Sequence, residues 1–135
     1  MPHVATCLVL HEGKLLLLKR SEKVRTYKGQ WGAVAGYIEH NETPLETAYK
    51  ELKEEANIDR EDTTFLKEGE LVKYTDEYEG QRYDWIIHPF LFKIEKKGKV
   101  QIDWEHSQYV WIKPRDLSNY ETVPRLKEIV YKMCL

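Results

Sequence analysis

Residues 36–58 read GYIEHNETPLETAYKELKEEANI and contain the best-specified helix of the chain. Thr43 places a hydroxyl at the N-cap, Pro44 takes the first helical position, and Glu46 follows three residues after the cap. This arrangement is a capping box, which defines where a helix begins. Asn57 follows Ala56, and asparagine adopts the left-handed conformation that closes a helix more readily than most residues. The spacing therefore predicts a helix from Pro44 to Ala56.

The predicted helix carries three carboxylates on one face. At about 100° per residue, Glu51, Glu54 and Glu55 share an arc of about 100° that lies beside the apolar stripe, not opposite it. The stripe that must face the core consists of Leu45, Ala48, Tyr49, Leu52 and Ala56. Carboxylates one turn apart repel each other, more strongly where water is partly excluded, so we expect a divalent cation to compensate them. Mg²⁺ suits a few carboxylates that leave positions for water and phosphates. An ordinary solvated acidic face is the alternative.

The same stretch resembles the signature of the Nudix hydrolases. That signature is Gly, five residues, Glu, seven residues, then Arg-Glu-U-x-Glu-Glu-x-Gly-U, where U is aliphatic. The matching positions are Gly36, Glu42, Glu51, Leu52, Glu54, Glu55 and Ile58. Lys50 stands where the family usually has arginine, and Asn57 where it has glycine. We expect Lys50, which lacks the arginine fork, to orient a carboxylate less rigidly. Glu42 is expected to support the turn before the helix or to pair with Lys50.

The resemblance implies a site for one or more Mg²⁺ or Mn²⁺ ions. The ligands would be the carbonyl of Gly36 and the carboxylates of Glu51, Glu54 and Glu55. The ions would neutralise charge on a diphosphate and activate water for attack on phosphorus. The general base differs among family members, and the candidates here are Glu51, Glu54 and, outside the signature, Glu105.

Substrate recognition is less well specified. Arg20 and Arg25 belong to a basic stretch before the signature that could meet phosphates, or could be merely solvated. Glu39 is a candidate for a water-mediated metal contact. Tyr74 lies in the region where a tyrosine in relatives of the family accompanies particular nucleotide preferences, which makes it a weak candidate for substrate binding.

The rest of the chain predicts strands around the helix and a second helix at the end. Strands are expected over 4–10, 15–19, 65–74, 83–94, 100–102 and 109–112, and a turn over 114–117. Val123, Leu126, Val130 and Met133 recur at helical spacing, which predicts an amphipathic terminal helix. The pattern and the resemblance together predict a Nudix-type α/β/α sandwich on a mixed β-sheet.

Composition limits the class of protein. With 135 residues, we expect residues 1–135 to form a single domain of about the usual 100–200 residues. The 21 Lys and Arg residues against 23 Asp and Glu residues argue against nucleic acid as a partner. The longest uncharged apolar run, from Val4 to Leu10, is shorter than the roughly 20 residues that span a bilayer. Two cysteines and no basic, apolar leader favour the cytoplasm.

By the resemblance, we expect metal-dependent hydrolysis of a diphosphate linkage in a nucleoside diphosphate joined to another moiety, with a nucleoside triphosphate as the first candidate substrate. Dinucleoside polyphosphates, ADP-ribose and coenzyme A are alternative substrates. Two further alternatives are a Nudix-fold module that binds nucleotide without catalysis, which three intact glutamates disfavour, and a diphosphate isomerase of the same fold. A homodimer is left open.

Overall fold

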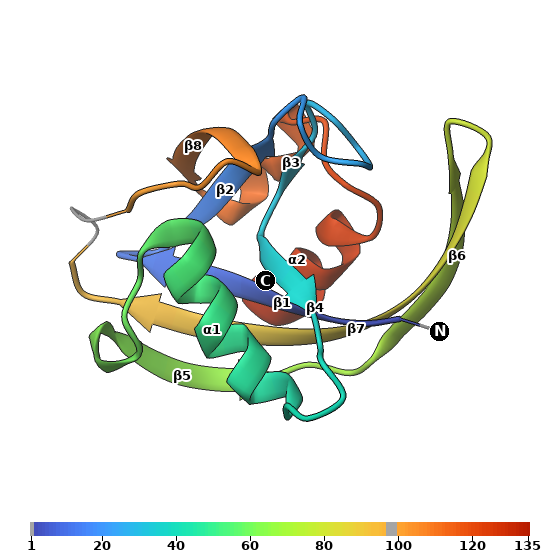
Figure 1. Cartoon of the computed structure of the whole chain (residues 1–135). Helices are drawn as coiled ribbons and strands as arrows, with labels where there is room; N and C mark the ends of the chain where they lie inside the picture. Colours follow the sequence, from blue (N-terminus) through green and yellow to red (C-terminus); the bar gives the residue numbers. More distant parts are fainter. Residues whose placement is uncertain (1, 97–99) are drawn as a thin grey trace.

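A mixed sheet of eight strands forms the centre of the structure, a computed structural model that describes residues 2–96 and 100–135 (Figure 1). The strands are β1 (His3–His11), β2 (Lys14–Arg20), β3 (Trp31–Gly32), β4 (Val34–Tyr37), β5 (Thr63–Glu68), β6 (Val72–Tyr78), β7 (Gln81–Ile94) and β8 (His106–Ile112). β1 runs parallel to β7, and the other strand pairs are antiparallel. β2 and β4 share the remaining edge of β1. This arrangement brings β4 into the middle of the molecule.

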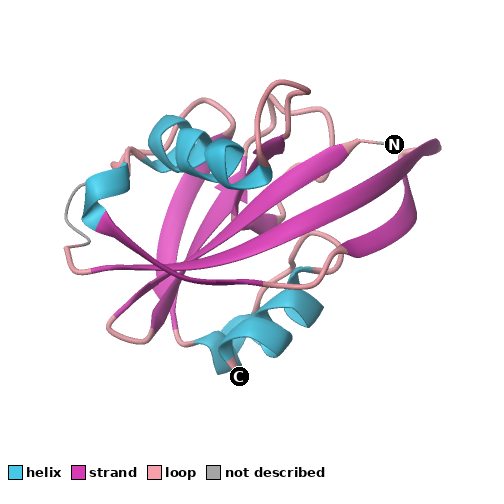
Figure 2. Ribbon diagram, turned by 90° about the horizontal axis from the view of Figure 1, so that it is seen from below, coloured by secondary structure: helices cyan, strands magenta, loops and turns pink. Residues whose placement is uncertain are grey.

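One α-helix covers each face of the sheet (Figure 2). The helices are α1 (Pro44–Ala56), α2 (Leu126–Cys134) and the short 3₁₀ helices η1 (Arg60–Asp62) and η2 (Pro114–Asn119). Leu52 of α1 packs with Phe92 in one buried cluster, and Val130 of α2 packs with Leu17 in the other. Because successive side chains of a strand point to opposite faces, the apolar runs of β1 and β2 supply both clusters. The result is the α/β/α sandwich that the sequence predicts.

The bounds of α1 are those expected. Thr43 Oγ1 accepts a hydrogen bond from the Glu46 amide at 3.1 Å, and Glu46 Oε1 accepts one from the Thr43 amide at 2.7 Å. Asn57 closes the helix at φ 58° and ψ 36°. The predicted capping box and left-handed cap are therefore confirmed.

Two predictions of strands were wrong. Residues 65–74 are not one strand, because residues 69–71 interrupt it; β5 and β6 both pair with β7, and between them the Gly69 amide donates to the Pro89 carbonyl of β7 at 2.8 Å. Residues 100–102 form no strand. Val100 instead packs into the α1-side cluster, and the Gln101 amide donates to the Ala56 carbonyl at 3.0 Å. At residues 100–102 these tertiary contacts outweigh the strand propensity of the sequence.

Two other boundaries differ from the expectation. The turn predicted over 114–117 is the first part of η2, and the terminal helix begins at Leu126, after Val123. Residues 76–78 lie outside the expected strands but are strand, since β6 runs to Tyr78 and the turn is made by Glu79 and Gly80.

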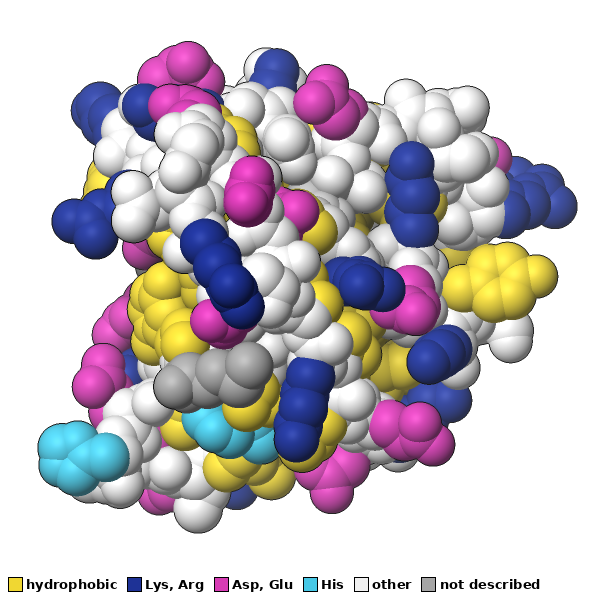
Figure 3. Space-filling view, turned by 90° about the vertical axis from the view of Figure 1, so that its right-hand side faces the viewer, with side chains coloured by type: hydrophobic (Ala, Val, Ile, Leu, Met, Phe, Trp, Pro, Cys, Tyr) yellow, Lys and Arg dark blue, Asp and Glu magenta, His cyan; other side chains and the backbone are white. Residues whose placement is uncertain are grey.

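Basic and acidic side chains are interspersed on the face shown in Figure 3, as the near-neutral composition suggests. Within residues 2–96 and 100–135, neither long helix combines the length and the apolar character needed to cross a bilayer.

Candidate active site

Gly36 and Glu51 meet where β4 ends beside α1. A Cβ atom added at Gly36 would overlap the Cγ, Cδ and Oε2 atoms of Glu51. Glycine therefore allows the Glu51 side chain to lie directly against the backbone of β4, which any larger residue would prevent. This contact explains why a glycine precedes the helix by this distance.

Glu55 is buried one turn further along α1. Only 3% of its surface is exposed, and its Oε1 accepts a hydrogen bond from the Ala35 amide at 3.0 Å. Burial raises the pKa of Glu55 well above its ordinary value, although the hydrogen bond from Ala35 opposes the shift, and the charge of Glu51 adds to it. A buried carboxylate with one amide donor is incompletely compensated, which leaves capacity for a cation.

Glu51 is half-buried between Glu55 and solvent. Burial raises the pKa of Glu51 from 4.5 to about 7, and the charges of Glu54 and Glu105 add to the rise while Lys50 opposes it. The predicted repulsion among the carboxylates of α1 is therefore present in the fold. Glu105, distant in sequence, lines the same cavity as Glu51.

The remaining acidic candidates differ in their surroundings. Glu54 is exposed on α1, whereas Glu105 is half-buried and lines a cavity with Glu51 and Glu55. Burial raises the pKa of Glu105, Asp103 raises it further, and Arg20 lowers it. The cavity is therefore lined by Glu51, Glu55 and Glu105, whereas Glu54, on the same face of α1, is exposed and does not line it.

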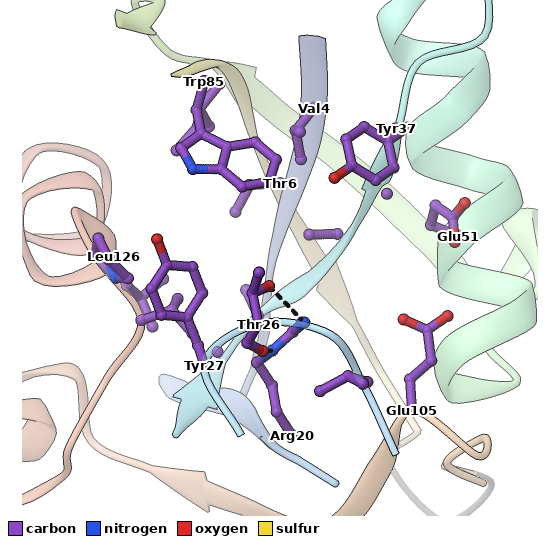
Figure 4. Close-up of a pocket in the computed structure, with 18 of the residues that line it drawn as sticks. Val4, Thr6, Arg20, Thr26, Tyr27, Tyr37, Glu51, Trp85, Glu105 and Leu126 are labelled. Carbon is purple, nitrogen blue, oxygen red and sulfur yellow. Dashed lines mark hydrogen bonds between the residues drawn. The ribbon is translucent and has the colours of Figure 1, made fainter. Parts of the chain in front are cut away.

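This cavity, of about 620 Å³, extends from the glutamates across the sheet to the start of α2 (Figure 4). A volume of this size is typical of small-ligand sites, which span about 300–1,000 Å³. All four residues predicted to contact substrate line it: Arg20, Arg25, Glu39 and Tyr74. Arg25 and Glu39 are exposed there, while Tyr74 is half-buried, which raises its pKa to about 12.

Arg20 is partly engaged in holding the cavity wall. Its Nε donates to the Thr26 carbonyl at 2.8 Å, and a terminal nitrogen donates to Thr26 Oγ1 at 3.3 Å. Two of its donors thus support the segment that follows β2. The sequence contains no local signal for this contact, because it joins residues across a loop of irregular structure.

That segment, residues 21–30, connects two sides of the cavity. The sequence did not reveal this connecting role. At one end the Ser21 amide donates to the Glu105 carbonyl at 2.8 Å. At the other, the Tyr27 hydroxyl donates to Asp76 Oδ2 at 2.7 Å, and the Lys28 amide donates to Tyr78 Oη at 3.2 Å. We call residues 21–30 the bridging loop, since it joins the Glu105 segment to β6.

Lys50 and Glu42 form the ion pair that the sequence suggested. Lys50 Nζ donates to the two carboxylate oxygens of Glu42 at 2.8 and 3.0 Å, and Thr47 Oγ1 donates to Glu42 Oε1 at 2.7 Å. These hydrogen bonds lower the pKa of Glu42. Glu42 is therefore occupied in holding the turn before α1.

The donor set of the site suits a hard cation. In the part of the chain that the structure describes, no three His, Cys, Asp or Glu side chains form a ready-made metal cage. Mg²⁺ is commonly held by one or two carboxylates, with water and substrate phosphates as the other ligands, so a complete cage is not required. The site offers oxygen ligands only, which fit Mg²⁺ or Mn²⁺; they are the half-buried Glu51, the buried Glu55 and the nearby carbonyl of Gly36.

Comparison with known proteins agrees with this geometry. The sequence matches the NUDIX domain over residues 1–133. The chain belongs to the NUDIX family of hydrolases. The family includes a nucleoside triphosphatase, NudI of Escherichia coli O139:H28, that is 26% identical over 119 residues, covering 84% of this chain and 83% of that protein.

Solved structures show the same fold. A Caenorhabditis elegans Ap4A hydrolase in a binary complex has a TM-score of 0.80 at 22% identity, covering 98% of this chain and 94% of that one. The Escherichia coli dihydroneopterin triphosphate pyrophosphohydrolase has a TM-score of 0.81 at 17% identity, with the same coverage of 98% and 94%. As a member of the NUDIX family, this chain is a hydrolase of pyrophosphate linkages in nucleotide derivatives.

Proposed function

We propose that this protein is a divalent-metal-dependent pyrophosphohydrolase whose substrate is a nucleoside triphosphate or a related nucleotide. The observation that carries the proposal is the packing of Glu51 against Gly36 with buried Glu55 beside it, at one end of a cavity of about 620 Å³. The similarity to a nucleoside triphosphatase supports the choice of substrate class.

Each residue of the site has a proposed role. Glu51, Glu54, Glu55 and the carbonyl of Gly36 would hold Mg²⁺ or Mn²⁺, and the bound ion would neutralise phosphate charge and activate water. Glu105 is a candidate to accept the proton of the attacking water, because it is half-buried in the cavity and burial raises its pKa above the ordinary value. Glu51 and Glu54 are the other candidates for this role.

The substrate-facing residues come from several elements. Arg25 is exposed and lines the cavity, and we propose that it meets the substrate phosphates; Arg20 lines the same cavity. Glu39 is an exposed residue of the cavity lining and is proposed to act on the ion through water. Tyr74 borders the part of the cavity next to α2 and is proposed to contact the nucleoside.

The test is turnover of a panel of nucleotides in Mg²⁺, with dinucleoside polyphosphates, ADP-ribose and coenzyme A included. Glu54→Gln should lower kcat by about 10²-fold or more without loss of folding, because Glu54 is exposed and off the apolar stripe. Glu61→Gln, an exposed substitution in η1, is the matched control. Unchanged turnover in Glu54→Gln would remove Glu54 from the metal site. Nucleotide binding without cleavage by the wild-type protein would favour the non-catalytic module.

A further inference from the structure

Tyr37 is an exposed aromatic side chain whose ring packs against a second aromatic ring. Its exposed fraction is 56%, although its ring stacks on Trp85 with centroids 5.9 Å apart and planes 27° apart. Trp85 is buried and stacks in turn on Tyr83 at 5.7 Å and 13°. The three rings form a row that is buried at Trp85 and open at Tyr37.

The open end of this row faces the cavity beside the glutamates. Tyr37 is the last residue of β4 and directly follows Gly36, against which Glu51 is packed. Figure 4 shows its ring between Val4 and Glu51, with the hydroxyl directed into the cavity. Burial raises the pKa of Tyr37, while the charges of Arg20 and Arg25 lower it, so both guanidinium groups act on this end of the cavity.

We propose that Tyr37 is the platform on which the heteroaromatic ring of the substrate stacks, with the phosphates directed toward Glu51 and Arg25. This inference rests on the proposed function, since it takes the cavity to be a nucleotide site. It makes Tyr37 a specificity-determining residue that selects for a planar ring next to the phosphates. Stacking on an aromatic face is tolerant of which base is present, because every base has a π face.

The geometry favours Tyr37 over its aromatic neighbours. Trp85 also lines the cavity, but it is only 9% exposed and its Nε1 is buried, so it offers a ligand much less ring surface than Tyr37 does. Trp104 also lines the cavity at 62% exposure, but no ring contact braces it among the residues that the structure describes. A ring that is already held loses little conformational freedom when a ligand stacks on it, which favours binding.

The experiment compares Tyr37→Leu, Tyr37→Phe and the control Tyr131→Leu, which alters a 70% exposed tyrosine on α2 that does not line the cavity. With nucleoside triphosphates and Mg²⁺, Tyr37→Leu should raise KM by about 10-fold with little change in kcat, whereas Tyr37→Phe should stay near wild type. With ribose 5-triphosphate, which has no base, Tyr37→Leu should behave as wild type. Nuclear Overhauser contacts between base protons and the Tyr37 ring, in a complex with a non-hydrolysable nucleotide, give a second readout.

Failure of this inference is separable from failure of the proposed function. An unchanged KM in Tyr37→Leu, an equal loss with ribose 5-triphosphate, or an absence of base contacts to the Tyr37 ring would each overturn the platform. If the wild-type protein cleaves no nucleotide but binds one, and Tyr37→Leu weakens that binding about 10-fold, hydrolysis fails and the platform stands. If the wild-type protein neither cleaves nor binds any nucleotide of the panel, both fail.

Discussion

Glu51 is a half-buried carboxylate whose charged form is disfavoured both by burial and by the neighbouring negative charges. Its ordinary pKa of 4.5 rises to about 7, first because the fold removes water from it and then because Glu54 lies beside it. Between these two pH values the folded protein keeps a proton that the unfolded chain has released. Ionisation of Glu51 therefore destabilises the folded state, and a bound cation would offset this loss.

The consequence is a pH-dependent stability of the metal-free protein. The stabilising effect of the Glu51 proton is fully present below pH 4.5 and is lost as the pH rises through about 7. In EDTA, Glu51→Gln should gain stability relative to wild type as the pH is raised from 5 to 8, measured by denaturant unfolding. Adding Mg²⁺ at pH 8 should then stabilise wild type more than the variant. Parallel stability curves for the two proteins would contradict this reading of Glu51.

Lys50 supports the site through Glu42. Because its single ammonium reaches both carboxylate oxygens, arginine could replace it with a bidentate pair of similar direction. Lys50→Arg should therefore leave kcat/KM unchanged or raise it modestly in the nucleotide assay. A loss of tenfold or more would show that the lysine has a geometry of its own, at a cost of about 1.4 kcal/mol in the transition state.

At the scale of elements, α1 carries Glu51, Glu54 and Glu55, and hydrogen bonds fix both of its ends. At its carboxyl end the Asn57 and Ile58 amides donate to the carbonyls of Lys53 and Leu52 at 3.0 and 3.1 Å. Lys53 Nζ also donates to Asn57 Oδ1 at 3.1 Å. This cap satisfies carbonyls that a helix otherwise leaves unpaired.

The left-handed conformation of Asn57 allows a direct test of that cap. Asn57→Ala should lower the free energy of unfolding by about 1 kcal/mol, because a Cβ without a compensating polar group is strained at φ 58°. Asn57→Gly, the residue usual in the family, should stay close to wild type. Chemical denaturation of the three proteins measures both changes, and an equal loss in the two variants would point to the side-chain contact with Lys53 instead.

At the scale of the whole molecule, the bridging loop joins parts of the chain that are far apart in sequence. It contacts the Glu105 segment through Ser21 and β6 through Tyr27, so the cavity wall is held from both sides. The rings of Tyr27 and Tyr78 also pack together, with centroids 4.9 Å apart. The shape of the cavity thus depends on contacts between separate elements.

Tyr27→Phe should loosen this wall. It removes the hydrogen bond to Asp76 and keeps the ring contact with Tyr78, so we expect a loss of about 1–2 kcal/mol in stability and a higher KM. Relative to wild type, the rate of amide hydrogen exchange in the variant should increase more in residues 21–30 than in α1. Equal exchange rates in the loop of the variant and of wild type would show that the hydrogen bond does not hold it.

The local sequence was sufficient wherever neighbouring residues decide the structure. The capping box, the proline at the first helical position and Asn57 predict α1 to the residue, since a helix end is set by contacts within a few positions. The apolar runs 4–10 and 15–19, separated by the turn-like residues 11–14, predict the hairpin of β1 and β2 for the same reason. The face shared by Glu51, Glu54 and Glu55 follows from helical geometry.

Contacts between distant residues decided the rest. Only the folded chain shows that Gly36 is needed to admit Glu51, that Glu105 shares a cavity with Glu55, and that Arg20 is engaged by Thr26. Residues 100–102 form no strand although their sequence favours one. The physical reason is that burial, charge repulsion and close packing depend on which groups meet in space. Composition and periodicity do not specify which distant groups those are.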